Sequence, residues 1–175
     1  MKMENEKIMI PEVTSVQLFR LIQNIYPSEQ VPIDRINGLL GRSKVGNAAV
    51  TGESIGILVR EKSTISLTKE GQNLGRALVS KNLEEQRKIL KELVLKNPVL
   101  EFIYSLIKDK KIMKNREIGQ NIAIQFNKNW KHELSYSRYG TNCGNILAAA
   151  GLGDYVNGIY SFEKMQVSNI SEEIS

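Results

Sequence analysis

The 175-residue sequence has little of several residue types that define whole classes of protein. A single cysteine, Cys143, excludes an internal disulfide, and a single histidine, His132, leaves too few ligands for a Cys/His zinc site. No apolar run approaches the ~18 residues of a membrane span. The charged N-terminus also lacks the apolar stretch of a secretory signal. These absences predict a cytoplasmic protein with no cofactor, no metal ion and no contact with the membrane.

The residues that are present are typical of a folded protein. Hydrophobic residues make up 41% of the chain and charged residues 25%, which is enough for a core and excludes wholesale disorder. The net charge is +5, and much of the excess lies in residues 98–140, where eight basic residues accompany four acidic ones. A mildly basic chain permits a nucleic-acid partner without requiring one.

Apolar periodicity in the first half predicts three helices, a β-hairpin and a further helix. Residues that favour helix starts precede the amphipathic runs: Thr14 or Ser15, Pro32, Ser43 and Thr68. Gly41 ends the second helix, and the third continues toward Ile55. Two β-prone runs, 57–59 and 64–67, flank a charged turn and predict the hairpin.

The second half repeats this order after a connecting helix. Helices are expected over residues 83–95, from Pro98 to a polar turn at 109–115, from Arg116, and over residues 136–150, with Ser135 as the cap of the last. Asn157-Gly158 between two β-prone runs predicts a hairpin, because a type I′ turn requires positive φ at both central positions.

Three helices followed by a hairpin is the order of a winged helix-turn-helix. The run Ile65-Ser-Leu-Thr-Lys-Glu-Gly71 resembles the LTxxG signature that joins wing to helix in winged-helix regulators. The run Ser135-Tyr-Ser-Arg-Tyr-Gly-Thr-Asn142, with Asn157-Gly-Ile-Tyr160, is similar to the third helix and short wing of such a domain. Over about residues 11–162 the tandem arrangement resembles archaeal AAA-associated regions and the DNA-recognition parts of restriction-modification proteins.

We therefore expect a mostly α-helical α+β fold with small β-hairpins, built as two winged helix-turn-helix units in tandem. The first unit is expected over residues 11–82 and the second over residues 98–162. Residues 83–97 form the connecting helix, and the polar tail at 163–175 is expected to be frayed.

This layout predicts binding of double-stranded DNA through the third helix of each unit. The N-terminal half of such a helix can meet base edges, while wings and helix N-termini contact phosphates. Arginine can pair with guanine and asparagine with adenine. The candidate residues of the first unit are Arg42, Ser43, Lys44 and Asn47 on the helix and Arg60 and Lys62 on the wing. Those of the second unit are Lys128, Lys131, Ser135, Tyr136, Ser137, Arg138, Asn142 and Asn145.

Structural roles compete with DNA contact for several of these residues. Arg138, Asn142 and Asn145 share one helix face. Polar residues of these types are equally typical of a helix face that contacts only solvent. Gly41 and Gly46 are compatible with a tight turn in place of a base-reading helix. The lysines at 108, 110, 111 and 114 fit a solvated turn as well as a phosphate contact, and the tyrosines at 136 and 139 fit helix packing.

The sequence displays no catalytic constellation. Gly41 and Gly46 have the opening spacing of a phosphate-binding loop, but Asn47-Ala48 replaces its Lys-Ser/Thr pair. Cys143 is expected to be a small buried packing residue. We therefore predict a DNA-binding protein and not an enzyme, either a transcriptional regulator or the recognition subunit of a DNA-processing or restriction system. The alternative is a winged-helix adaptor for a larger protein assembly. A homodimer is compatible with either role.

Overall fold

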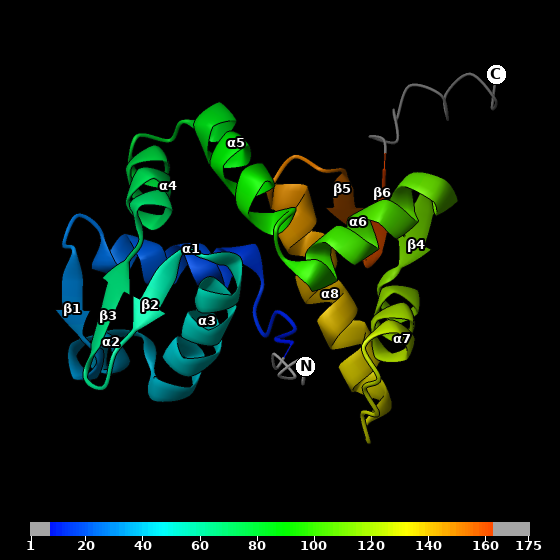
Figure 1. The fold of residues 1–175 in the computed structure, drawn as a ribbon, viewed down its shortest axis with the longest axis horizontal. Coiled ribbons are helices and arrows are strands. Elements are labelled where there is room, and N and C mark those ends of the chain that lie inside the picture. Colours follow the sequence, from blue (N-terminus) through cyan, green and yellow to red (C-terminus); the bar gives the residue numbers. More distant parts are fainter. Residues whose placement is uncertain (1–7, 163–175) are drawn as a thin grey trace, which may run out of the picture.

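The computed structural model describes residues 8–162, which form eight helices and six short strands (Figure 1). This confirms the prediction of a mostly helical chain with small antiparallel sheets. The predicted tail at 163–175 lies outside the described residues. Within the described residues, no helix combines the length and the apolar character needed to cross a bilayer.

The two halves follow the same order of elements and are joined by two helices. The first half contains α1 (Ser15–Ile25), β1 (Gln30–Pro32), α2 (Ile33–Leu40), α3 (Arg42–Ile55), β2 (Leu58–Arg60) and β3 (Thr64–Leu67). The joining helices are α4 (Lys69–Val79) and α5 (Leu83–Val94). The second half contains α6 (Pro98–Lys110), β4 (Ile112–Lys114), α7 (Asn115–Gln125), α8 (Glu133–Ala149), β5 (Asp154–Val156) and β6 (Ile159–Ser161).

Each half has one three-stranded antiparallel sheet, and the two sheets have equivalent strand orders. The orders are β1-β3-β2 and β4-β6-β5, so the last strand of each half lies in the middle. The hairpin predicted at Asn157-Gly158 is present, with φ of 50° and 76° at these residues. The first strands, β1 and β4, were not expected from the sequence, which predicted a polar turn where β4 lies. Each strand has only three residues and pairs with a partner far along the chain.

The third helix of each half begins earlier than predicted. Gly41, with φ of 92°, joins α2 directly to α3, so Ser43 lies inside the first turn and is not the cap. In the second half His132 is the N-cap residue, and Ser135 donates its N–H to the His132 carbonyl. The predicted cap Thr68 is confirmed, because its side chain accepts a hydrogen bond from the Gly71 N–H.

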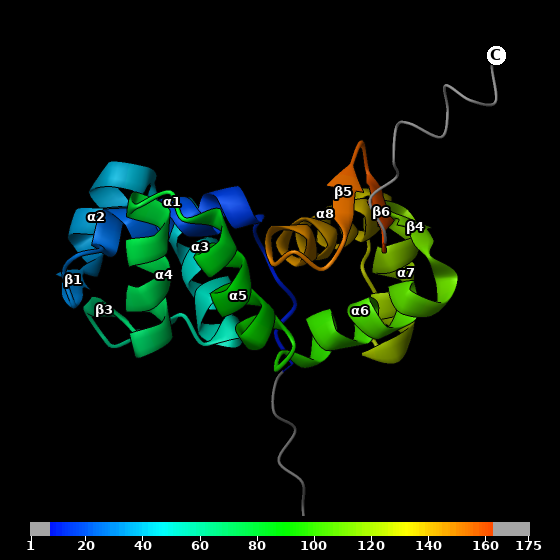
Figure 2. The same ribbon diagram turned by 90° about the horizontal axis from the view of Figure 1, so that it is seen from above.

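The N-terminal segment, residues 8–14, lies between the two halves (Figure 2). The Glu12 N–H donates to Thr51 Oγ1 of α3 at 2.9 Å. On the other side, Asn142 of α8 donates to the Pro11 carbonyl at 3.1 Å. Buried apolar residues of both halves and of α5 belong to one hydrophobic core. The segment therefore connects the third helices of the two halves within one packed body.

Candidate nucleic-acid interface

The N-terminal half of α3 presents a polar, basic face to solvent. Four of its side chains are exposed, namely Arg42, Ser43, Lys44 and Asn47, whereas Val45, Ala48 and Ala49 on the opposite face are buried. The first turn contains no acidic residue, and within residues 8–162 no side chain caps its N-terminus. Because the first amides of a helix lack partners within the helix, this end carries free donors and partial positive charge beside two cationic side chains.

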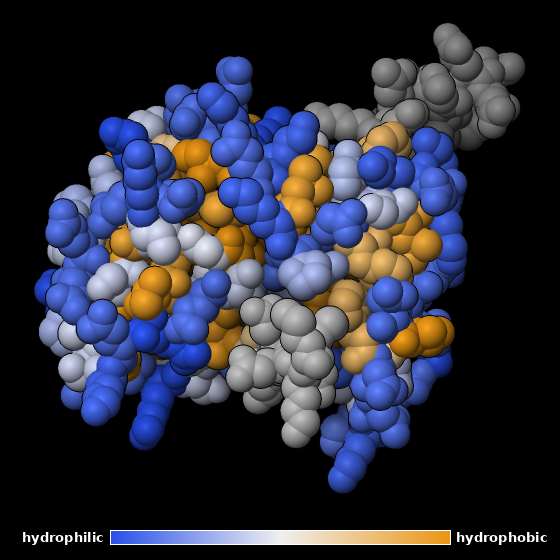
Figure 3. Space-filling view, viewed as in Figure 1, coloured by the Kyte–Doolittle hydropathy of each residue, from blue (hydrophilic) through white to orange (hydrophobic). Residues whose placement is uncertain are grey.

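The wing of the first half lies on the same side of the molecule as the start of α3. The turn between β2 and β3 and the start of α3 both face the lower edge in Figure 1. The side chains that project from that edge are hydrophilic (Figure 3). Lys62 is exposed in this turn. Arg60 is engaged with Glu53 of α3 in an ion pair, which ties the wing to the helix.

One basic residue near this face was missed by sequence reasoning. Arg20 of α1 is exposed and lines, together with Lys44 and Gln17, a small cavity of about 70 Å³ between α1 and α3. The apolar periodicity of α1 could have indicated that Arg20 is exposed. Leu18, Leu21 and Ile25 form the stripe that faces the core, and Arg20 lies outside it.

The C-terminal half of α8 is not available to DNA, which corrects the assignment of two candidate residues. Asn142 is only 5% exposed and is bonded to the Pro11 carbonyl. Asn145 accepts hydrogen bonds from the Ser15 N–H and Oγ–H at 2.8 and 2.7 Å. Asn145 thus binds the first turn of α1. Both side chains fix the joint between the halves, and we remove them from the candidate interface.

The N-terminal half of α8 and the loop before it keep some of their predicted residues at the surface. Lys131 and Arg138 are exposed, and the Arg138 guanidinium lies 4.9 Å from the centre of the Tyr139 ring. These positions remain open to phosphate contacts, but the surrounding charge is mixed, because Glu133 at the start of α8 pairs with Arg116. The half-buried candidates of this region are Lys128, Ser135 and Ser137.

Tyr136, Tyr139 and Trp130 form an aromatic cluster beside the start of α8. Trp130 stacks on Tyr139 with ring centres 4.5 Å apart and meets Tyr136 nearly edge-on at 5.1 Å. The Tyr139 hydroxyl donates to Glu12 at 3.2 Å. Burial, followed by the negative charge of Glu12, raises the pKa of Tyr139. The contacts of Tyr136 and Tyr139 are therefore those of helix packing, which the sequence left open as the alternative to DNA contact.

The lysines before α7 show the contacts of a solvated turn. Lys108 lies over the Tyr104 ring and Lys111 over the Phe162 ring, at 4.8 and 4.6 Å. Lys110 pairs with Glu117 at 3.0 Å. Their positive charges are thus partly engaged within the second half. The middle of the predicted turn, Ile112–Lys114, forms strand β4.

Cys143 is buried, as the sequence predicted for a small packing residue. Cys143 is fully buried, and this burial raises the pKa of its thiol, so the nucleophilic thiolate is disfavoured. Within residues 8–162 no group of three or more His, Cys, Asp or Glu side chains is placed to hold a metal ion. No protein-family model, curated protein or solved structure matches this chain.

Proposed function

We propose that each half of the chain is a winged helix-turn-helix unit and that the protein binds double-stranded DNA, chiefly through the first half. The support is the repeated order of elements, helix-strand-helix-helix-strand-strand, with equivalent strand orders in the two sheets. In this arrangement the third helix enters the major groove and the hairpin lies along the backbone. A role in transcriptional regulation or in a DNA-processing or restriction system follows from this activity.

One observation carries the proposal: the exposed N-terminal half of α3. Its amides and the cations Arg42 and Lys44 form a surface that suits phosphate oxygens. Asn47 lies further along the exposed face, where its amide can read adenine through paired hydrogen bonds. Lys62 of the wing and Arg20 of α1 extend the positive charge to either side.

The second half has a supporting role in this proposal. Lys131 in the loop before α8 and Arg138 in its N-terminal half contribute phosphate contacts, and this end of α8 also faces the lower edge in Figure 1. The remainder of α8 holds the halves together through Asn142 and Asn145. Base readout is therefore assigned to α3.

Fluorescence anisotropy of a labelled duplex over a series of salt concentrations tests the proposal. Binding is expected to weaken linearly in log salt, with a slope of about −0.9 for each phosphate contacted. Replacing Lys44 by Ala should make this slope less negative by about 0.9, because one phosphate contact is lost. The matched control, Lys88→Ala on α5, removes an exposed lysine remote in sequence from the candidate residues and should leave the slope unchanged. Absence of binding at about 50 mM salt would refute DNA binding.

The alternative function, an adaptor in a larger protein assembly, is favoured by a different observation. Two large apolar side chains at the α7–α8 end of the second half, Ile124 and Leu134, are each 82% exposed. Exposed apolar groups that gather in one region are typical of protein contact surfaces. Failure of the salt series, together with binding to a protein partner that Ile124→Glu abolishes, would favour the adaptor.

A further inference from the structure

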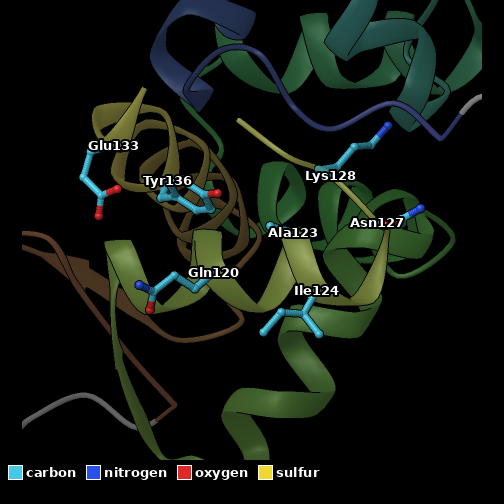
Figure 4. Close-up of a pocket in the computed structure, with 7 residues that line it drawn as sticks. All are labelled: Gln120, Ala123, Ile124, Asn127, Lys128, Glu133 and Tyr136. Atoms are coloured by element: carbon cyan, nitrogen blue, oxygen red, sulfur yellow. The ribbon is translucent and has the colours of Figure 1, made fainter. Parts of the chain in front are cut away.

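A hollow of about 580 Å³ lies between the C-terminal part of α7 and the start of α8 (Figure 4). The Tyr136 ring and the Ala123 methyl group provide apolar lining, and Gln120 and Asn127 add polar groups. The two charged residues that line the hollow, Glu133 and Lys128, stand on opposite sides of Ala123 in Figure 4. The surface thus has an apolar middle with one charge of each sign at its ends.

One apolar side chain of the lining projects into solvent. Ile124 belongs to its lining and is 82% exposed, and Leu134, equally exposed, follows Glu133 directly in α8. A projecting apolar group next to a recess gives the surface both a convex and a concave part. Burial of such side chains is the main favourable contribution to association.

The charges of Lys128 and Glu133 indicate which kind of molecule fits the hollow. DNA is a poor fit, because the Glu133 carboxylate repels phosphates and the Ile124 side chain presents no hydrogen-bonding group. A second copy of the same surface fits well, because contacts across a two-fold axis are reciprocal: where residue i of one copy meets residue j of the other, residue j of the first also meets residue i of the second. Rotation by a half-turn places the end with Lys128 against the end with Glu133, and does so twice.

We propose that two copies of this chain associate through this hollow about a two-fold axis. Ile124 of each copy enters the hollow of the other, and each Lys128 pairs with Glu133 of the partner subunit. Glu133 also pairs with Arg116 of its own chain, and a carboxylate has acceptor sites for both cations. This association does not use the α3 surface and would give a particle with two copies of it.

Sedimentation velocity without DNA, over a range of protein concentrations, tests the association. The wild-type chain is expected to shift from monomer to dimer as the concentration rises. Ile124→Glu should remain monomeric, because a carboxylate would be buried without a partner. The matched control is Val79→Glu, which alters a residue of α4 that is 62% exposed, and it should dimerise like the wild type. Circular dichroism checks that both variants fold.

A charge-reversal experiment tests the two-fold geometry itself. Lys128→Glu places two pairs of like charges in the interface, and so does Glu133→Lys, so each variant alone should dimerise at least tenfold more weakly than the wild type. In a mixture of the two variants both contacts join opposite charges, so a heterodimer should form. Dimerisation of Ile124→Glu equal to that of Val79→Glu would overturn the proposal. So would a wild-type chain that is monomeric at every concentration, or a mixture no better than its components.

The outcomes remain separable from those of the DNA-binding test. A chain that dimerises but shows no salt-dependent DNA binding retains this inference and loses the proposed function. A chain that binds DNA as a monomer at every concentration retains the proposed function and loses this inference.

Discussion

The third helices of the two halves, α3 and α8, occupy the same place in the order of elements but have different surroundings. In α3 the N-terminal half is exposed, and its first turn carries Arg42 and Lys44 without an acidic residue. In α8 the first turn contains Glu133, and the C-terminal half is packed against α1 and the N-terminal segment. The comparison teaches that equivalent elements need not keep equivalent functions. The surface that we propose for DNA in one half corresponds to a structural joint in the other.

The glycines of the two helices give the sharpest way to test this difference. A Cβ on Gly140 of α8 would lie 1.8 Å from the Asn115 carbonyl oxygen, so Gly140→Ala must push α7 and α8 apart. We expect a loss of about 3 kcal/mol of unfolding free energy, which lowers Tm by roughly 6–12 °C in a chain of this size. Thermal unfolding followed by circular dichroism measures it.

The control is the same substitution in α3. Gly46 lies inside the helix and has nothing within 4 Å of its hypothetical Cβ. Gly46→Ala should therefore raise the unfolding free energy by about 0.5–1 kcal/mol, because alanine loses less backbone entropy than glycine when a helix forms. Equal effects of the two substitutions would show that α7 and α8 are not as closely packed as described.

An asparagine in each helix separates a structural role from a binding role. Asn142→Ala leaves the Pro11 carbonyl without its partner in a buried joint, and we expect a loss of about 2 kcal/mol of unfolding free energy. Asn47→Ala removes an exposed side chain and should change the free energy by less than about 0.5 kcal/mol. Urea denaturation measures both.

The DNA affinities of the same two variants should show the opposite order. Asn47→Ala is expected to reduce the preference for one duplex sequence over another by about 1–3 kcal/mol, the usual worth of a paired contact to a base. An Asn142→Ala chain that remains folded should keep that preference. If instead Asn142→Ala loses sequence preference while its stability is unchanged, the assignment of α8 to the joint is wrong.

Much of the fold could be predicted from the sequence, because it depends on local patterns. Apolar periodicity located the helices, and Thr68 and Asn157-Gly158 marked a cap and a turn through side-chain and backbone preferences that act within four residues. Strands β2, β5 and β6 are as short as β1 and β4, but a hairpin turn beside each of them marked it in the sequence. Strands β1 and β4 escaped prediction because no such turn adjoins them, and their partners lie more than 30 residues away.

The exposure of the candidate residues was predictable in α3 and not in α8 for a related reason. Spacing along a helix shows which side chains share a face, but not what packs on that face. The partners of Asn142 and Asn145, Pro11 and Ser15, precede them by about 130 residues. Only the tertiary structure reveals that the polar face of α8 meets the N-terminal segment, whereas the face of α3 with Arg42 and Asn47 meets solvent.

Alkaline pH provides a smaller test of the same difference, because it acts on the buried face of α8. The Cys143 thiol is fully buried, and burial raises its pKa above the ordinary value of 9.0. Above pH 9 the unfolded chain releases this proton while the folded chain retains it, so a rise in pH favours unfolding. From this group alone, the unfolding free energy should fall with a slope that steepens, as the unfolded thiol ionises, toward roughly 1 kcal/mol per pH unit. Urea denaturation at successive pH values measures the slope.

The thiol is distinguished from the other alkaline groups by Cys143→Ala. This variant is less stable at neutral pH because it loses a packed sulfur atom, but between pH 9 and 10 its stability should depend less on pH than that of the wild type. Tyr139 and Tyr160 also have raised pKa values, chiefly through burial, and their effect begins higher, above the ordinary tyrosine value of 10.0. Identical slopes for the two chains in that window would show that Cys143 ionises as readily in the folded protein as in the unfolded one. The face of α8 that carries it would then be open to solvent like that of α3.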